Sequence, residues 1–95
     1  MSEIGIILDE LYEVVLDRIK NPKEGSYTNY LLEKGVDKIV KKVGEEACEV
    51  VIAAKNGKKD EMVSEISDLL YHLTVLLVQQ NITLDEIYDE LKKRR

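Results

Sequence analysis

The chain has 95 residues, a formal net charge of −5, 44% apolar residues and 35% charged residues, a composition that predicts one folded domain over residues 1–95 and excludes a disordered chain. The acidic balance argues against a nucleic-acid or anionic-membrane surface, because both require a basic patch. No segment has the roughly 18 consecutive apolar residues of a membrane span, and the N-terminus lacks a signal-peptide pattern, so we expect a cytoplasmic protein.

Two helices are predicted in the first third of the chain. Over residues 3–20, apolar residues recur at the spacing of one buried helical face, namely at Ile4, Ile7, Leu8, Leu11, Val15 and Ile19. The stretch "NPKEG" ends this helix, because the residue before a proline is biased away from helical dihedrals. The next stretch, "SYTNYLLEKG", predicts a short helix that Ser26 or Thr28 caps and that Gly35 ends.

Two long helices follow and form the predicted centre of the fold. The first spans residues 36–56 and ends at a left-handed cap supplied by Asn56 and Gly57, and the second spans residues 61–80 with Asp60 as its N-cap. Each carries an apolar stripe that we expect to be buried. The stripes consist of Val36, Ile39, Val40, Val43, Ala47, Val50, Val51 and Ala54 on the first helix, and Met62, Ile66, Leu69, Leu70, Leu73, Leu76 and Leu77 on the second.

The C-terminal stretch "ITLDEIYDELKKRR" predicts a last helix, because Thr83 and Glu86 match a capping box. No strand pattern is present, so the predicted fold class is all-α, a helical bundle around a long antiparallel helix hairpin. A chain of this length buries only a modest core, and a partner subunit would add to it. Cys48 is the only cysteine and is interpreted as a small packing residue.

Acidic residues border the two apolar stripes. At about 100° per residue, Glu46 and Glu49 adjoin the stripe of one long helix, while Glu65 and Asp68 adjoin that of the other. Each acid has a like-charged neighbour three residues away, so the arrangement repels itself. If the helices pack as a hairpin, the four carboxylates lie at similar distances from the turn, measured along the helix axes. Four carboxylates that meet at a partly buried contact between two helices require either raised pKa values or bound cations. The alternative interpretation is that these acids form a solvated face of the protein.

Bound cations explain this pattern better than raised pKa values do. All four candidate ligands are hard oxygen donors without a Cys/His cluster, which favours Mg²⁺ or Mn²⁺ over zinc. Magnesium held by a few carboxylates meets its substrates through phosphates, which indicates phosphate-ester or anhydride chemistry. No glycine-rich phosphate loop and no nucleophile-base pair accompany the acids, so covalent and P-loop mechanisms have no support.

The stretches "EEACE" and "EISD" resemble the E-E-x-x-E and E-x-x-D signature of the all-α nucleotide pyrophosphohydrolases, which include MazG-type enzymes and dimeric dUTPases. The wider blocks "GSYTNYLLEKGVDKIVKKVGEEACEVVIAAKN", "EISDLLYHLTVLL" and "LDEIYDELKKRR" resemble the phosphoribosyl-ATP pyrophosphohydrolase family of histidine biosynthesis. This resemblance implies Mg²⁺-dependent hydrolysis of phosphoribosyl-ATP to phosphoribosyl-AMP and pyrophosphate by a homodimer. In some organisms this domain is fused to the next enzyme of the pathway, and we expect this chain to stand alone.

The resemblance also implies roles for individual acids. Its metal ligands fall on Glu46, Glu49, Glu65 and Asp68, the same four that the helical geometry selects. Glu45, Glu46 and Glu49 form the expected catalytic group. Glu45 lies further from the seam, and it either orients a ligand, polarises the attacking water or is simply solvated.

Further candidates surround the acids. Lys42 either binds a substrate phosphate or neutralises Glu46, and Lys55 and Asn56 either contact the nucleotide or only end their helix. The resemblance implies a substrate-lining loop at Ser26, Tyr27 and Thr28, where an N-cap and a packing tyrosine are the structural alternative. Tyr71 and His72 are expected to support the acids, with His72 hydrogen-bonded to Asp68 four residues earlier.

Two alternatives to the specific activity stay open. One is a house-cleaning hydrolase that acts on non-canonical nucleoside triphosphates, which the acidic motif permits and the flanking blocks disfavour. The other is a non-enzymatic helical dimerisation module whose acids are solvated; it predicts no Mg²⁺ binding and tolerance of alanine at Glu46 and Glu65.

Overall fold

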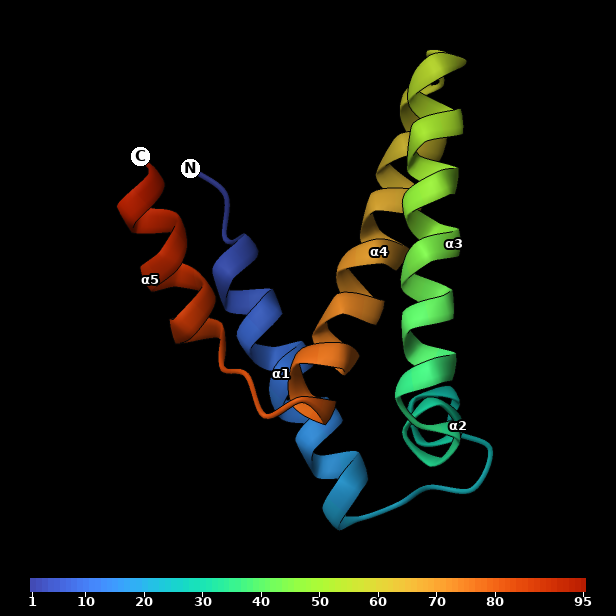
Figure 1. The fold of residues 1–95 in the computed structure, drawn as a ribbon, viewed down its shortest axis with the longest axis vertical. Coiled ribbons are helices and arrows are strands. Elements are labelled where there is room, and N and C mark those ends of the chain that lie inside the picture. Colours follow the sequence, from blue (N-terminus) through green and yellow to red (C-terminus); the bar gives the residue numbers. More distant parts are fainter.

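The computed structural model describes all 95 residues and contains five helices and no strand (Figure 1). The helices are α1 (Ile4–Lys20), α2 (Tyr27–Lys34), α3 (Val36–Lys55), α4 (Lys59–Gln79) and α5 (Leu84–Arg94). The predicted all-α fold class is confirmed. After α3 the chain reverses, and α4 returns alongside it, while α1 and α2 lie at the end of this pair that is remote from the turn (Figure 1).

Most of the predicted helix ends are confirmed. Ser26 caps α2 by accepting a hydrogen bond from the backbone N–H of Asn29, and Thr83 and Glu86 form the capping box of α5. Gly57 has the left-handed φ of 65° at the end of α3. The backbone N–H groups of Gly57 and Lys58 donate to the carbonyls of Ala54 and Ala53 at 3.1 and 3.3 Å, which is a Schellman motif.

The predicted N-cap of α4 is wrong. The helix begins at Lys59, its N-cap is Lys58, and no side chain accepts a hydrogen bond there. The reason is the Schellman motif, which leaves Lys58 in an extended conformation and lets the next helix begin at once. Asp60 lies in the first turn of α4 instead, where its negative charge is favourable to the helix dipole.

The core lies where the first four helices meet. It consists of Val15, Leu31, Ile39, Val75 and Val78. Large parts of the predicted apolar stripes are exposed in the single chain, so that prediction is wrong for Ile4, Ile7, Ile19, Val36, Val40, Val51 and Ile66. Helical periodicity identifies an apolar face, but α1 and α2 cover only part of the α3/α4 pair. Cys48 is also exposed, contrary to its interpretation as a packing residue.

None of the five helices combines the length and the apolar character that crossing a membrane requires.

Candidate cation and substrate site

Three carboxylates from two helices converge on the α3/α4 pair. Glu46 and Glu49 lie on one side of α3 because they are three residues apart, and the packing of α4 against α3 adds Glu65. One oxygen from each side chain lies within 4.8 Å of those of the other two. Glu46 is only 7% exposed, so part of this carboxylate cluster is shielded from water.

The carboxylate cluster contains buried oxygens that no group in the chain satisfies. The Oε2 atoms of Glu46 and Glu65 are both buried and lack a hydrogen-bond partner. The neighbouring Glu49 carboxylate, burial and the nearby Glu46 carboxylate raise the pKa of Glu65 to about 7. A buried carboxylate without a partner is costly, so the three acids require either a proton or a cation between them.

Lys42 supplies the positive charge nearest to these acids. Its Nζ lies 3.5 Å from Oε1 of Glu45 and 4.0 Å from Oε1 of Glu46. Although partial burial lowers the pKa of Lys42, the nearby Tyr27, Glu45 and Glu46 raise it by more, and the side chain stays an ammonium. Because Lys42 reaches only Glu45 and one oxygen of Glu46, it leaves the buried Oε2 atoms uncompensated.

The composition of the carboxylate cluster fits a hard divalent cation. All of its donors are carboxylate oxygens, which Mg²⁺ and Mn²⁺ prefer. Glu45 and Asp68 do not belong to the cluster, and both are exposed. Asp68 lies three residues after Glu65, on the same side of α4, so the structure brings three of the four predicted metal ligands together and leaves the fourth beside them.

A polar contact joins α2 to α4 beyond the carboxylate cluster. The Tyr27 hydroxyl lies 2.9 Å from Nε2 of His72, and Oγ1 of Thr28 lies 2.5 Å from the Tyr71 hydroxyl. Burial raises the pKa of the Tyr71 phenol. His72 does bond to Asp68 as expected, through the Asp68 backbone carbonyl at 2.8 Å. The "SYT" and "YH" segments of the sequence are therefore direct neighbours.

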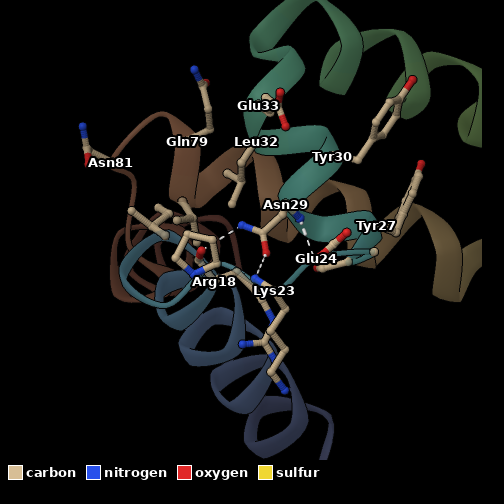
Figure 2. Close-up of a pocket in the computed structure, with 15 residues that line it drawn as sticks. Arg18, Lys23, Glu24, Tyr27, Asn29, Tyr30, Leu32, Glu33, Gln79 and Asn81 are labelled. Atoms are coloured by element: carbon tan, nitrogen blue, oxygen red, sulfur yellow. Dashed lines mark hydrogen bonds between the residues drawn. The ribbon is translucent and has the colours of Figure 1, made fainter.

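A cavity of about 1030 Å³ forms an open groove between the α1–α2 connection, α2 and the end of α4 (Figure 2). Ser26 and Tyr27 line it, whereas the three clustered acids do not. Asn29, which sequence reasoning missed, holds the connection in place: its side chain accepts from the Lys23 N–H at 2.9 Å and donates to the Arg18 carbonyl at 2.8 Å. No local pattern marks Asn29, because its side chain bonds to residues six and eleven positions earlier in the chain.

The remaining substrate candidates lie elsewhere. Lys55 ends α3 and Asn56 is its C-cap, and both are exposed at the α3–α4 turn. At about 1.5 Å per residue, Lys55 is roughly 9 Å along α3 from Glu49. The turn and α2 lie at opposite ends of the α3/α4 pair (Figure 1), so the single chain does not bring Lys55 and Asn56 to the groove at Ser26.

These features define an all-helical protein with a carboxylate cluster suited to a divalent cation. The chain belongs to the phosphoribosyl-ATP pyrophosphohydrolase family, whose model matches residues 8–95. It is 56% identical over 95 residues to a phosphoribosyl-ATP pyrophosphatase of Clostridium novyi, covering all of this chain and 86% of that protein. A phosphoribosyl-ATP pyrophosphatase of Listeria monocytogenes is 62% identical over 88 residues, which are 93% of this chain and 84% of the relative.

One similar relative is longer than this chain. The histidine biosynthesis bifunctional protein HisIE of Caldanaerobacter subterraneus is 67% identical over 94 residues, which cover 98% of this chain and 46% of that protein. The chain thus spans about half the length of this bifunctional relative.

Proposed function

We propose that the chain hydrolyses phosphoribosyl-ATP to phosphoribosyl-AMP and pyrophosphate in histidine biosynthesis, in a reaction that depends on Mg²⁺. Membership of the family and the names of the relatives support the substrate and the pathway. The observation that carries the chemistry is the carboxylate cluster, in which Glu46 and Glu65 each keep one buried oxygen without a partner.

In this proposal Glu46, Glu49 and Glu65 hold the cation, and Asp68 joins them by turning its side chain. Mg²⁺ is the expected ion, and Mn²⁺ has the same preference for oxygen donors. When bound, the cation offsets the negative charge of the substrate phosphates and of the pyrophosphate that leaves. The acids in turn gain the positive partner that their buried oxygens lack.

Two residues beside the carboxylate cluster act on the substrate directly. The Lys42 ammonium, which Glu45 and Glu46 hold beside the acids, is placed to pair with a phosphate oxygen that approaches them. When Lys42 pairs with a phosphate instead of with Glu45, the exposed Glu45 carboxylate is released and accepts at Oε1 a proton from the water that attacks phosphorus, while the phosphorus–oxygen bond to the departing pyrophosphate breaks. Lys42 therefore serves in phosphate binding as well as in neutralising Glu46.

We further propose that the active form is a homodimer. The outer half of the α3/α4 pair exposes Val51, Ile52, Val63 and Ile66, at 60%, 59%, 59% and 43%. Exposed apolar surface of this extent on a small chain is typical of an interface, and a second α3/α4 pair would complete a four-helix arrangement. Light scattering should give twice the chain mass of 10.9 kDa, and Val51→Glu should reduce it to that of one chain.

The test of the activity is pyrophosphate release from phosphoribosyl-ATP, ATP and dUTP, compared side by side with Mg²⁺ and with a chelator. Phosphoribosyl-ATP should be cleaved fastest, and the chelator should stop the reaction. Equal rates on all three nucleotides would instead identify a house-cleaning hydrolase. No release from any of them would favour the non-enzymatic dimerisation module.

A further inference from the structure

His72 is buried, and both of its ring nitrogens are engaged. It is 5% exposed, with Nδ1 2.8 Å from the Asp68 carbonyl oxygen and Nε2 2.9 Å from the Tyr27 hydroxyl. Tyr27 itself is 44% exposed. A ligand can therefore reach Tyr27 but not His72, so any effect of His72 on a ligand passes through the tyrosine.

The hydrogen-bond partners fix which atoms carry protons. A carbonyl oxygen can only accept, so Nδ1 of His72 is protonated and donates to Asp68. In the neutral imidazole Nε2 is then an acceptor, and the Tyr27 hydroxyl donates to it. Because the Tyr27 hydroxyl donates its proton to His72, its oxygen can only accept a hydrogen bond from an incoming molecule.

Such an oxygen discriminates between the parts of a nucleotide. It accepts a hydrogen bond from a hydroxyl or amino group, whereas a phosphate oxygen has no proton to donate. Tyr27 is the first residue of α2 and lines the open groove. Its hydroxyl contacts His72, which lies seven residues or about 10 Å along α4 from Glu65, so Tyr27 lies near the carboxylate cluster where phosphate is proposed to bind.

We propose that His72 is a positioning residue that holds Tyr27 as a hydrogen-bond acceptor for a ribose hydroxyl of the substrate. This role rests on the proposed function, because it specifies how the same site recognises the sugar next to the phosphates. In this arrangement the ribose of the substrate binds at Tyr27, and its phosphates bind at Lys42 and the carboxylate cluster.

The test compares the KM for phosphoribosyl-ATP among variants of this contact. Tyr27→Phe removes the acceptor and should raise KM about tenfold, the equivalent of about 1.4 kcal/mol, with little change in kcat. His72→Asn can keep the bond to Asp68 but cannot reach Tyr27, and it should raise KM to a similar extent. His72→Gln places an amide oxygen near the position of Nε2 and should restore KM to near the wild-type value.

A matched control separates positioning from folding. Tyr12→Phe makes the same chemical change at a hydroxyl that donates to the Ile82 carbonyl at 2.8 Å, between α1 and the α4–α5 connection. It should lower the unfolding temperature about as much as Tyr27→Phe does and leave KM unchanged. The double variant Tyr27→Phe/His72→Asn should have the KM of either single variant, because both break the same contact.

The outcomes distinguish the two proposals. An active wild type whose KM is unmoved by Tyr27→Phe and His72→Asn overturns the positioning role alone. Additive effects in the double variant also overturn it, because they would show that the two side chains act independently. A wild type that releases no pyrophosphate refutes the proposed function, and the affinity of the same variants for uncleaved phosphoribosyl-ATP then decides the role of Tyr27.

Discussion

Two polar regions lie along α4 and differ in how their buried groups are satisfied. In the contact between α2 and α4, Tyr27, Thr28, Tyr71 and His72 pair with one another or with backbone. In the carboxylate cluster, about seven residues or roughly 10 Å along the helix, acids face acids and two buried oxygens have no partner. In the first region the side chains find their hydrogen-bond partners within the chain. In the carboxylate cluster the two buried oxygens need a proton or a cation that the chain does not supply.

This difference indicates that the contact between α2 and α4 positions side chains, whereas the carboxylate cluster takes part in the reaction. Hydroxyl and imidazole groups that satisfy one another lock the helices together, and each such hydrogen bond contributes about 1 kcal/mol. Carboxylates that repel one another weaken the fold, and natural proteins retain such arrangements at functional sites. Substitutions in the two regions should therefore have different effects: loss of turnover in the carboxylate cluster, and loss of stability in the contact between α2 and α4, with a raised KM but little change in kcat at Tyr27 and His72.

The largest expected effect is in the carboxylate cluster. Glu49→Gln should lower kcat by about 10³-fold, because cation-assisted charge stabilisation is worth several kcal/mol, while helix content by circular dichroism stays unchanged. Glu10→Gln, which makes the same change at an exposed acid of α1, is the matched control and should retain full activity. An active Glu49→Gln variant with unaltered Mg²⁺ dependence would remove this residue from the site.

A smaller effect is expected in the contact between α2 and α4. Tyr71→Phe leaves the buried hydroxyl of Thr28 without its partner and should lower the free energy of unfolding by about 1–2 kcal/mol. Urea titration should show a lower midpoint at an unchanged slope. Tyr88→Phe alters an exposed ring and should have no such effect. If Tyr71→Phe instead abolished cation binding with stability intact, the two regions would not be separate.

The smallest expected effect is on the pH dependence of stability without cations. The pKa of Glu65 is about 7 in the folded protein and 4.5 ordinarily, so folding takes up a proton between these values. The stability that this proton contributes is present below pH 4.5 and is lost as the pH rises through 7. Glu65→Gln cannot titrate, so urea midpoints measured with a chelator should decline less for this variant. Parallel pH profiles would contradict a raised pKa.

The sequence predicted the local features of the fold well. Gly57 at the end of α3 and the Thr83–Glu86 capping box depend only on residues adjacent in the chain, and both are confirmed. Asp60 failed as an N-cap because the preceding Schellman motif had already set the start of α4. Exposed Val51 failed as a core residue because periodicity shows which face is apolar but not what covers it.

In the candidate site, too, features set by local spacing could be predicted and contacts between distant parts of the chain could not. Glu46, Glu49 and Glu65 could be predicted to converge, because helical spacing and a short turn between two helices suffice to place them. The bond between Tyr27 and His72 joins residues 45 apart in the chain, and no local pattern encodes it. The side chain of Asn29, which bonds to residues on both sides of the α1–α2 connection, was missed for the same reason.

The most direct test of the central claim is Mn²⁺ binding followed by electron paramagnetic resonance, with Mg²⁺ as competitor. Wild-type protein should bind Mn²⁺ saturably and release it to Mg²⁺, and Glu46→Gln/Glu65→Gln should abolish binding while Tyr71→Phe retains it. Equal Mn²⁺ affinity in the wild type and the double variant would show that the carboxylate cluster does not hold the cation, and would contradict the account.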